Sequence, residues 1–458
     1  MSMDDAATKR AALLVATLTS FLTPFMGSSV NIALPSIGRE FAMDAVLLGW
    51  VATAYLLSAA MFLVPFGRIA DIHGRKRIFT YGILTFALSS LLSALSPSAI
   101  FLVSCRVLQG MGSAMIFGTG IAILTSVFPA KERGKVLGIN VAAVYSGLSL
   151  GPFIGGFLTQ QLGWRSIFFL NVPLSLIIIA FTLWKLKGEW AGAKGEKFDF
   201  AGSVIYALSL PAMMYGFTLL PAMSGAWLIG LGVLGLLAFI KWEIKAESPV
   251  LNINLFRNNK VFAFSNLASL INYGATFGVT FLLSLYLQYT KGLSPQQAGT
   301  ILVCQPVVMA LFSPLAGRLS DKIEPRVVAS IGMGFTMIAL FLFTSLNENT
   351  GLGYVITSLI VIGFGLALFS SPNTNAIMGS VEKRSYGVAA ATVGTMRLTG
   401  QMLSMGIAML VFAVYIGRAE ITPENYPAFL RSAKTAFIIF TVLCFGGIFA
   451  SLSRGKVR

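Results

Sequence analysis

The sequence predicts an all-α integral membrane protein, and three observations support this fold class. Hydrophobic residues make up 56% of the 458 residues and charged residues only 11%, with a mean hydropathy of +0.81. A soluble domain of this size would have about a quarter of its residues charged. Apolar runs long enough to cross a bilayer, about 20 residues each, recur along the chain. A short basic pattern between two such runs occurs twice.

About fourteen apolar segments are long enough to be transmembrane helices. They are centred near residues 23, 57, 87, 114, 147, 175, 210, 233, 275, 307, 336, 363, 401 and 441. The short pair near residues 210 and 233 gives the weakest signal. Twelve helices are expected instead if that pair lies on the membrane surface.

Lysine and arginine residues are concentrated in alternate loops. Of the 33, 25 fall in loops assigned to the cytoplasm, six in outside segments, and two, Arg106 and Arg397, inside apolar runs. The positive-inside rule then places both termini in the cytoplasm of a multi-pass cell-membrane protein. The net charge of +16 becomes a topology signal and a match to anionic lipid headgroups. Nucleic-acid binding is not expected, because the charge is not gathered on one soluble face.

The chain lacks the residues of a metalloenzyme, a nucleophilic enzyme or a nucleotide-driven pump. It has one histidine, His73, three cysteines that all fall in predicted spans, and no Gly-x-x-x-x-Gly-Lys-Ser/Thr phosphate loop. The loops are too short to form a separate soluble domain. We therefore expect no cofactor, no metal and no enzyme activity. The first apolar run lacks a small-residue cleavage site and is expected to remain as the first helix.

The repeated basic pattern is Gly-Arg-x-x-Asp, which begins at Gly67 and again at Gly317, 250 positions later. In the first copy, glycines permit a tight turn, and Asp71 is placed to bind an arginine or a helix N-terminus in only one conformation. The repeat favours a gate over a simple turn and topology signal. It predicts a transporter whose two halves rock about a central site. The expected gate residues are Gly67, Asp71, Gly74, Arg75, Arg318 and Asp321.

Two arginines lie inside apolar runs, where an uncompensated charge costs at least about a few kcal/mol. We expect Arg106 and Arg397 to face a hydrated central cavity; snorkelling to the membrane interface is the alternative. Gln109 and Gln401 each lie one turn away on the same helical face. With other polar residues of the spans, they are expected to line a mostly apolar substrate pocket. These other residues are Asn31, Tyr55, Gln288, Gln305 and Asn373.

The span near residue 147 is rich in glycine. Gly147, Gly151 and Gly155 share one helical face, which lets another helix backbone approach closely. Pro152 removes a backbone donor and favours a bend. Together with Gly156, these residues predict a packing hinge between the two halves, with ordinary small-residue packing as the alternative.

The acidic residues show the opposite distribution. All seventeen fall in predicted loops or at helix ends. No carboxylate is therefore expected at the membrane midplane to carry a proton.

These motifs resemble the major facilitator superfamily, in its fourteen-helix drug:proton antiporter branch. Residues 67–76 match the family's loop signature, and residues 106–110 match its Arg-x-x-Gln-Gly signature. Residues 147–156 match the antiporter signature Gly-x-x-x-Gly-Pro-x-x-Gly-Gly, and residues 31–35 match the end of the first-helix signature. The resemblance covers nearly the whole chain.

The resemblance implies two six-helix bundles with two extra helices between them, alternating access, and export driven by the proton gradient. On this pattern residues 1–190 form the N-terminal bundle, residues 191–250 the two linker helices with their flanks, and residues 251–458 the C-terminal bundle. Asp71 resembles a gate acid that docks near Gly387 when the cytoplasmic side is shut. Asp71 and Arg106 are the resulting candidates for proton coupling.

One position departs from the family pattern. The first-helix signature usually has an aspartate five positions before Asn31, where this chain has Met26. The expected function is export of small lipophilic compounds by proton antiport, carried out by a monomer in contact with membrane lipids. One alternative is a dedicated carrier for one anionic or neutral metabolite, which the two buried arginines would suit. Another is a transport-dead scaffold or sensor, against which the intact motifs argue.

Overall fold

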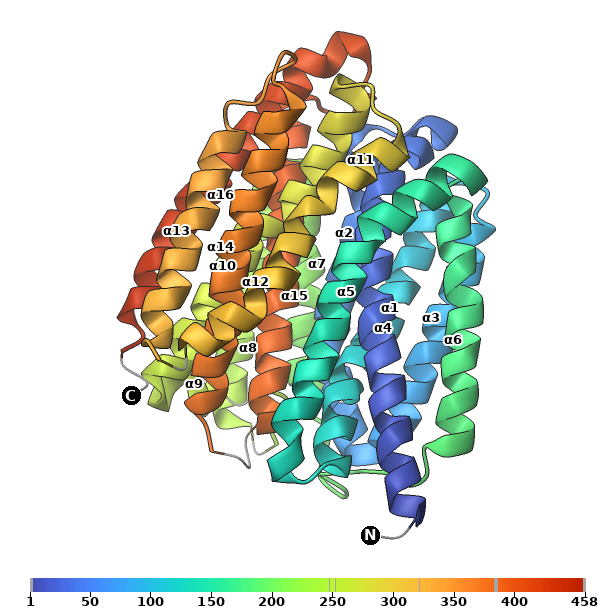
Figure 1. Ribbon diagram of the computed structural model, residues 1–458, viewed down its shortest axis with the longest axis vertical. Coiled ribbons are helices and arrows are strands. Elements are labelled where there is room, and N and C mark those ends of the chain that lie inside the picture. The colour runs from blue at the N-terminus through green and yellow to red at the C-terminus, as the bar shows by residue number, and fades with distance from the viewer. Residues whose placement is uncertain (1–2, 247, 252, 321, 383–385, 456–458) are drawn as a thin grey trace.

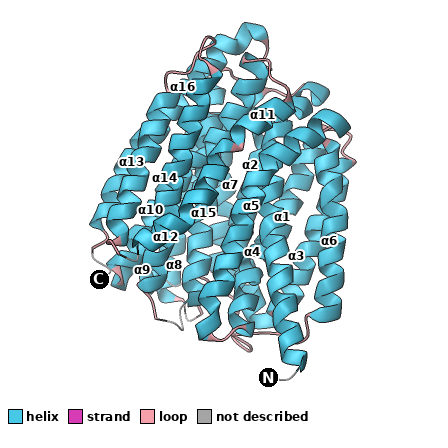
Figure 2. Ribbon diagram, viewed as in Figure 1, coloured by secondary structure: helices cyan, strands magenta, loops and turns pink. Residues whose placement is uncertain are grey.

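The computed structural model describes residues 3–246, 248–251, 253–320, 322–382 and 386–455 (Figure 1). The regular structure of this part of the chain is helical, joined by short loops and turns (Figure 2). Both chain ends lie at the lower end of the molecule in Figure 1. We call this end the terminal face and the other end the opposite face.

The helices form two bundles with two further helices between them in sequence. The first bundle contains α1 (Met3–Phe41), α2 (Ala45–His73), α3 (Arg75–Ala94), α4 (Ala99–Val127), α5 (Ala130–Leu162) and α6 (Arg165–Lys185). The two further helices are α7 (Phe200–Leu219) and α8 (Met223–Lys245). The rest comprises short α9 (Ile253–Asn258), α10 (Lys260–Leu285) with η1 (Tyr286–Thr290), α11 (Pro295–Leu302), α12 (Cys304–Ser320), α13 (Pro325–Phe343), α14 (Leu352–Gly379), α15 (Tyr386–Tyr415), η3 (Pro423–Asn425) and α16 (Tyr426–Ser453).

Fourteen segments of the described chain are long and apolar enough to cross a membrane, which confirms the predicted number. They include Phe200–Leu219 and Met223–Lys245, the pair about which the sequence was least decisive. The tenth segment, Pro295–Ser320, is built from α11 and α12, which are separated at Val303. Neither this break nor α9 was predicted from the sequence.

Side-chain caps fix where several helices begin. Each capping oxygen accepts a backbone N–H from the first helical turn, a group that would otherwise lack a partner. Ser294 and Gln297 form a reciprocal capping box at the start of α11. The other caps are Asp44 before α2, Ser98 before α4, Asp199 before α7 and Asn259 before α10.

The glycine face of α5 packs against α1 inside the first bundle. A Cβ atom at Gly147 would lie 2.3 Å from the carbonyl oxygen of Phe21, and one at Gly155 would lie 2.8 Å from the Cα of Ser29. A Cβ at Gly151 would be equally crowded, by the side chain of Ser28. The predicted close approach of a helix backbone is therefore confirmed. For these three glycines the partner belongs to the same bundle, so their placement between the two halves was wrong.

The linker helices contact both bundles. α7 packs against α8, and also against α2 of the first bundle and α15 of the second. Tyr206 of α7 donates a hydrogen bond to the carbonyl oxygen of Ala60 on α2, over 3.1 Å. The same side chain lies within hydrogen-bonding reach of Thr399 on α15. α7 therefore lies at the seam where the two bundles meet.

Candidate functional site

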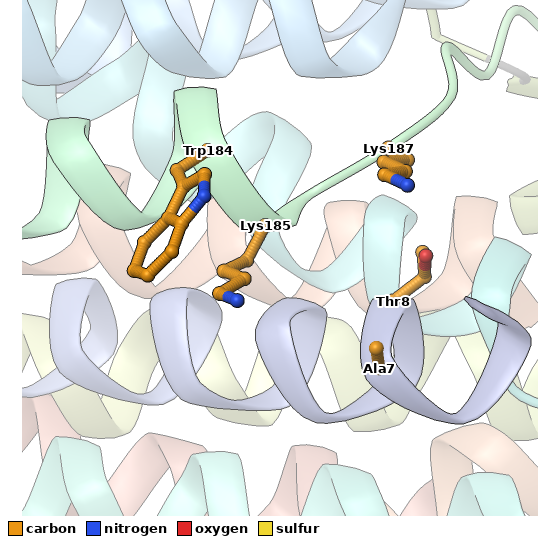
Figure 3. Close-up of a pocket in the computed structure, with 5 residues that line it drawn as sticks. All are labelled: Ala7, Thr8, Trp184, Lys185 and Lys187. Carbon is orange, nitrogen blue, oxygen red and sulfur yellow. The ribbon is translucent and has the colours of Figure 1, made fainter. Parts of the chain in front are cut away.

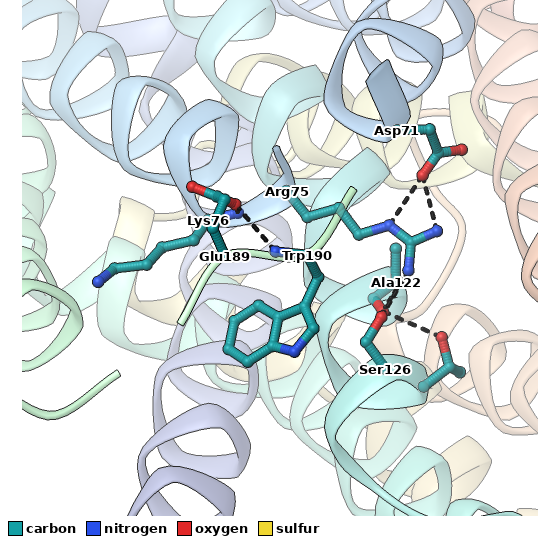
Figure 4. Close-up of polar contacts among 8 residues, drawn as sticks. Asp71, Arg75, Lys76, Ala122, Ser126, Glu189 and Trp190 are labelled. Carbon is teal, nitrogen blue, oxygen red and sulfur yellow. Dashed lines mark hydrogen bonds and ion pairs between the residues drawn. The ribbon is translucent and has the colours of Figure 1, made fainter. Parts of the chain in front are cut away.

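An ion pair spans the turn between α2 and α3, and its arginine also bonds α4 (Figure 4). Gly74 makes this turn with φ +119°, which only glycine adopts readily. The guanidinium of Arg75 lies 2.7–2.8 Å from Asp71 Oδ1. The same guanidinium donates to the carbonyl oxygen of Ala122 at 3.2 Å and to Ser126 Oγ at 2.5 Å. Asp71 therefore fixes the orientation of a side chain that joins α3 to α4.

Residues 188–198, which follow α6, close over this turn; we call them the strap. The Glu189 carboxylate accepts the backbone N–H groups of Lys76 and Arg77 at the N-terminus of α3, where negative charge is stabilised (Figure 4). Glu196 pairs with Arg68 at 2.5 Å. Two backbone hydrogen bonds, Arg75 to Trp190 and Ala193 to Asp71, complete the contact. Sequence reasoning missed these partners, although Glu189 and Glu196 stand out as acids in a basic loop.

The structure brings together only part of the predicted gate. Asp71 is paired with Arg75 inside the first bundle, and the docking near Gly387 stays a prediction. Arg318 is exposed at the end of α12, and Asp321 lies outside the described residues. Gly317 lies against α14, where an added Cβ would be 2.9 Å from Ser371 Oγ.

Arg106 is buried inside the first bundle, with only 1% of its surface exposed. Its Nε donates to the carbonyl oxygen of Val51 at 2.9 Å, and its Nη1 bonds the Oε1 of Gln109, as their shared helical face predicted. The guanidinium also lies over the ring of Tyr55, 4.4 Å from its centroid, a favourable cation–π geometry. The expected exposure of Arg106 to a hydrated cavity is wrong for this conformation. Neutral partners, which are a carbonyl, an amide and an aromatic ring, stabilise the guanidinium charge in place of a carboxylate.

Arg397 of α15 lies at the seam between the bundles. Its guanidinium carbon is 5.7 Å from the ring centroid of Tyr273 on α10, and the side chain is half-buried. Tyr145 of α5, in the other bundle, lies against Ser370 and close enough to Arg397 to interact electrostatically. Arg397 has no ion pair within the part of the chain that the structure describes. It is therefore a charge available to a ligand between the two bundles.

The other predicted cavity residues are dispersed. Tyr55 Oη pairs with Ser113 beside Arg106, whereas Gln288 bonds the backbone of α1 near Asn31. Asn373 is engaged by Arg454 at the terminal end of the second bundle. The backbone carbonyl of Gln305 packs against Gly363 of α14, and Gln401 is buried one turn from Arg397. The prediction of one shared pocket is therefore wrong for this conformation.

The seam is closed toward the opposite face by contacts of backbone with backbone. A Cβ at Gly156 of α5 would lie 2.5 Å from the carbonyl oxygen of Pro295, and one at Gly299 of α11 would lie 2.2 Å from that of Pro152. Ser284 Oγ of α10 also donates to the carbonyl oxygen of Asn31 at 2.7 Å. Pro152 and Gly156 therefore do lie between the two halves, as predicted.

The seam opens along α5 toward the terminal face. Residues 156, 152, 149 and 145 follow each other at helical spacing on the side of α5 that meets the second bundle, and they are buried or half-buried. The same stripe continues to Ala142 and Gly138, which are exposed. A Cβ at Gly138 would meet no atom within 4 Å. Along α5, the contact with the second bundle therefore ends before the terminal face, whereas α2 and α15 still approach each other, with a Cβ at Gly394 lying 3.8 Å from Leu63 Cδ2.

A buried arginine that sequence reasoning missed ties together the terminal end of the second bundle. Arg454 follows α16 and is fully buried. It donates to Asn373 Oδ1 at 2.7 Å, to the carbonyl oxygen of Pro325 at 3.1 Å, and to the hydroxyls of Ser265 and Ser451 at 3.2 Å. Burial lowers the pKa of Arg454 to about 10, so it stays charged at neutral pH. Its position in a basic tail gave no signal of this role.

Two pockets open on the terminal face. One, of about 190 Å³, lies between α1 and the end of α6 and is lined by Ala7, Thr8, Trp184, Lys185 and Lys187 (Figure 3). The second, of about 390 Å³, is lined by Lys197, Phe198, Asp199, Trp242, Ala246 and Ser248. Neither contains a predicted cavity residue. The seam at Arg397 is therefore the better candidate for a transport path.

Comparisons with known proteins agree with this architecture. The profile of the Major Facilitator Superfamily matches residues 16–264 and 265–456. The riboflavin transporter RibZ of Clostridioides difficile is 29% identical over 439 residues, 95% of each chain. The multidrug resistance protein Stp of Mycobacterium tuberculosis is 29% identical over 84% of this chain and 73% of its own. A peptide transporter, POT, solved with sulfate, shares the fold with a TM-score of 0.71 and 14% identity, covering 97% and 95%. The chain therefore belongs to the Major Facilitator Superfamily, as a multi-pass membrane transporter.

Proposed function

We propose that the protein exports small lipophilic compounds by alternating access, in exchange for protons, with its terminal face in the cytoplasm. The observation that supports this most directly is the shape of the seam. Backbone contacts such as that of Pro152 with Gly299 close it toward the opposite face, while the stripe of α5 at Gly138 is open toward the terminal face. A transporter that loads from the cytoplasm needs such a state.

The surroundings of the seam suit a lipophilic substrate with few polar groups. Small-molecule sites are mostly apolar with a small number of placed polar side chains. Arg397, Tyr145 and Tyr273 supply such groups from both bundles. Relatives named for multidrug resistance and for tetracenomycin C resistance and export support an exporter. Asp71 and Arg106 remain the proposed residues for proton coupling.

A second candidate function is the dedicated transport of one neutral or anionic metabolite. The half-buried guanidinium of Arg397 favours it, because the charge has no carboxylate partner among the described residues and would attract an anionic or carbonyl group. A relative named as a riboflavin transporter, similar along nearly the whole chain, also favours it.

Transport into proteoliposomes with imposed pH and voltage gradients tests both functions. We expect a proton gradient directed into the compartment that the terminal face contacts to drive several unrelated lipophilic compounds out of that compartment. Movement of riboflavin or another single metabolite alone would favour the dedicated carrier. Transport that is unaffected by the pH gradient would contradict proton antiport. Susceptibility profiling of cells that overproduce the protein gives an independent count of the compounds moved.

The contribution of Arg397 can be tested in the same vesicles. Arg397→Gln should raise the KM for anionic and carbonyl-rich substrates more than that for apolar ones. Arg418→Gln, which removes an exposed arginine near the opposite face, is the matched control. Equal effects of the two substitutions would remove Arg397 from the substrate path.

A further inference from the structure

Two carboxyl groups meet at the terminal ends of the linker helices. Glu243 of α8 is only 2% exposed, and its Oε1 has no hydrogen-bond partner in the structure. The position of a Cβ at Gly202 would be 2.4 Å from Asp199 Oδ2 and 2.8 Å from Glu243 Oε1. Because both oxygens lie that close to one point, they are at most 5.2 Å apart. The missing side chain at Gly202 leaves the space that lets the two groups approach.

The two carboxyl groups differ in their donors. Asp199 accepts the Gly202 N–H at 2.9 Å and the Trp242 indole N–H at 2.9 Å and 3.1 Å. These donors stabilise Asp199 as an anion. Glu243 Oε2 accepts the Leu251 N–H at 2.8 Å, whereas Oε1 faces Asp199 without a donor. The buried oxygen of Glu243 therefore lacks the hydrogen atom that would join it to Asp199.

We propose that Glu243 and Asp199 form a proton-binding site. One proton is bound to Glu243 Oε1 and is hydrogen-bonded to Asp199 Oδ2. Two carboxylates accept hydrogen bonds but donate none, so the approach of Asp199 to the buried Oε1 of Glu243 favours a shared proton or a cation. The proton comes from water at the terminal face and returns there, and no other bond changes.

The neighbouring groups favour a proton over a metal ion. Calcium and magnesium take about six or more oxygen ligands, whereas the two carboxyl groups supply four oxygens, of which three already accept N–H groups. A second lone pair on Asp199 Oδ2 still leaves room for one proton. No group of three or more metal-ligating residues occurs in the part of the chain that the structure describes.

Nearby cations also leave the pair uncompensated. Lys241 and Lys245 flank Glu243 in the sequence of α8, and Lys197 lines the same pocket as Asp199. Arg257 is carried by α9, which packs against α8, and Tyr206 of α7 is the other titratable group. Within the described residues, none of these cations forms an ion pair with Glu243 or Asp199. A proton is therefore the positive charge that the pair lacks.

Solvent reaches the pair from the terminal face. Asp199 and Trp242 line the pocket of about 390 Å³ described above, together with Lys197. Protons can therefore exchange through Asp199 while Glu243 remains buried. If the terminal face is cytoplasmic, as the proposed function holds, the site senses cytoplasmic pH.

The site is linked to the seam between the bundles. Phe239, one helical turn from Glu243, packs on the ring of Tyr206 with centroids 5.1 Å apart. Tyr206 in turn bonds Ala60 of α2 and lies against Thr399 of α15. Loss of the shared proton would leave two like charges at short range and push the ends of α7 and α8 apart. The seam helix α7 would then shift relative to both bundles.

Infrared difference spectroscopy on the purified, lipid-reconstituted protein tests the proton site without any substrate. At about pH 6, exposed glutamates are ionised. We expect the wild type to retain a protonated carboxylic acid C=O band at this pH, and Glu243→Gln to lose it. Asp199→Asn should shift the frequency of the band, because an uncharged amide then replaces the anionic acceptor of the shared proton. Glu424→Gln, at an exposed glutamate near the opposite face, is the matched control and should keep the band.

Three results would overturn the assignment: no such band in the wild type, a band unchanged in both variants, or a band removed by Mg²⁺ or Na⁺ at constant pH. If Glu243→Gln does not fold, the band shift in Asp199→Asn supplies the readout. The consequence for transport rests on the proposed function and is measured separately, as the dependence of transport rate on pH with equal pH on both sides. A protein that does not exchange protons for substrate could still show the band, so the two proposals can fail independently.

Discussion

Gly299 of α11 packs directly on the carbonyl group of Pro152 in α5, so closely that a Cβ at Gly299 would lie 2.2 Å from that oxygen. Real Cβ atoms do not approach backbone oxygens this closely. The contact joins the two bundles near the opposite face. Glycine at position 299 is therefore a condition for closing the seam there, and any side chain should oppose this closed state.

Gly299→Val should shift the protein toward states that are open at the opposite face. A ligand or mutation changes such an equilibrium only by its differential effect on the two states, and this clash exists in one of them. Distances between spin labels on the adjacent ends of α5 and α11 measure the shift. Gly334→Val is the control, because a Cβ at Gly334 meets no atom within 4 Å. Unchanged distances in a folded Gly299→Val protein would contradict this account of the seam.

Gly151→Leu should act differently, because Gly151 packs on α1 inside one bundle. The clash is then present in every conformation, so the folded state itself is destabilised. We expect a lower yield of folded protein and a lower Tm, without a selective change in the α5–α11 distance. Normal expression together with normal transport would show that this face of α5 tolerates a large side chain.

Asp71→Asn should slow turnover and leave substrate affinity nearly unchanged. Asp71 orients Arg75 at the terminal ends of α2 and α3, whereas the candidate substrate residue Arg397 lies within α15. Kinetic measurements in proteoliposomes should show a lower kcat at nearly constant KM. Asp44→Asn is a suitable comparison, because asparagine caps a helix about as well as aspartate. A full transport rate in the Asp71→Asn protein would exclude a gating role.

Met26→Asp should increase the transport of cationic compounds relative to neutral ones. Met26 is fully buried, and its sulfur accepts a hydrogen bond from Asn171 at 2.9 Å. The wild type has positive groups at Arg106 and Arg397, so we expect it to move dications less well than a matched neutral analogue. Met26→Asn separates the effect of charge from that of polarity. Repulsion by Arg106 and Arg397 does not select substrates if the wild type already exports dications equally well and Met26→Asp changes nothing.

Arg454→Gln should destabilise the second bundle. The substitution removes hydrogen bonds from a charged group to Asn373 and to the carbonyl oxygen of Pro325. Each such bond contributes about 1.5–3 kcal/mol when its partners are buried. Thermal unfolding in detergent should show a lower Tm, whereas substitution of the exposed Arg418 should not. An unchanged Tm would mean that water or the tail replaces these bonds.

The sequence predicted features that depend on local spacing. Helical periodicity placed Arg106 beside Gln109 and gathered the glycines of α5 on one face, and both relationships are present in the structure. Composition predicted the number of spans, including the pair α7 and α8. These features follow from residues a few positions apart, so a pattern in the chain is enough to reveal them.

Contacts between distant segments could not be predicted in this way. Arg454 and Asn373 are 81 positions apart, and Glu189 lies 113 positions from the Lys76 N–H that it accepts. Only the packing of helices decides which polar groups meet. For the same reason Asn373, expected in a central pocket, is instead engaged by Arg454. Sequence spacing placed each polar residue on a helix face but not opposite its partner.

The strap anchors the connection between the two bundles to the α2–α3 turn. Residues 188–198 leave α6, bind the backbone of α3 through Glu189, and then lead directly to Asp199 and α7. The strap is the first part of the segment that joins the two bundles, so this segment is anchored at the turn that is expected to gate the path. We expect a displacement of that turn to be transmitted through the strap to α7. The connection would then couple the position of the α2–α3 turn to that of the linker helices.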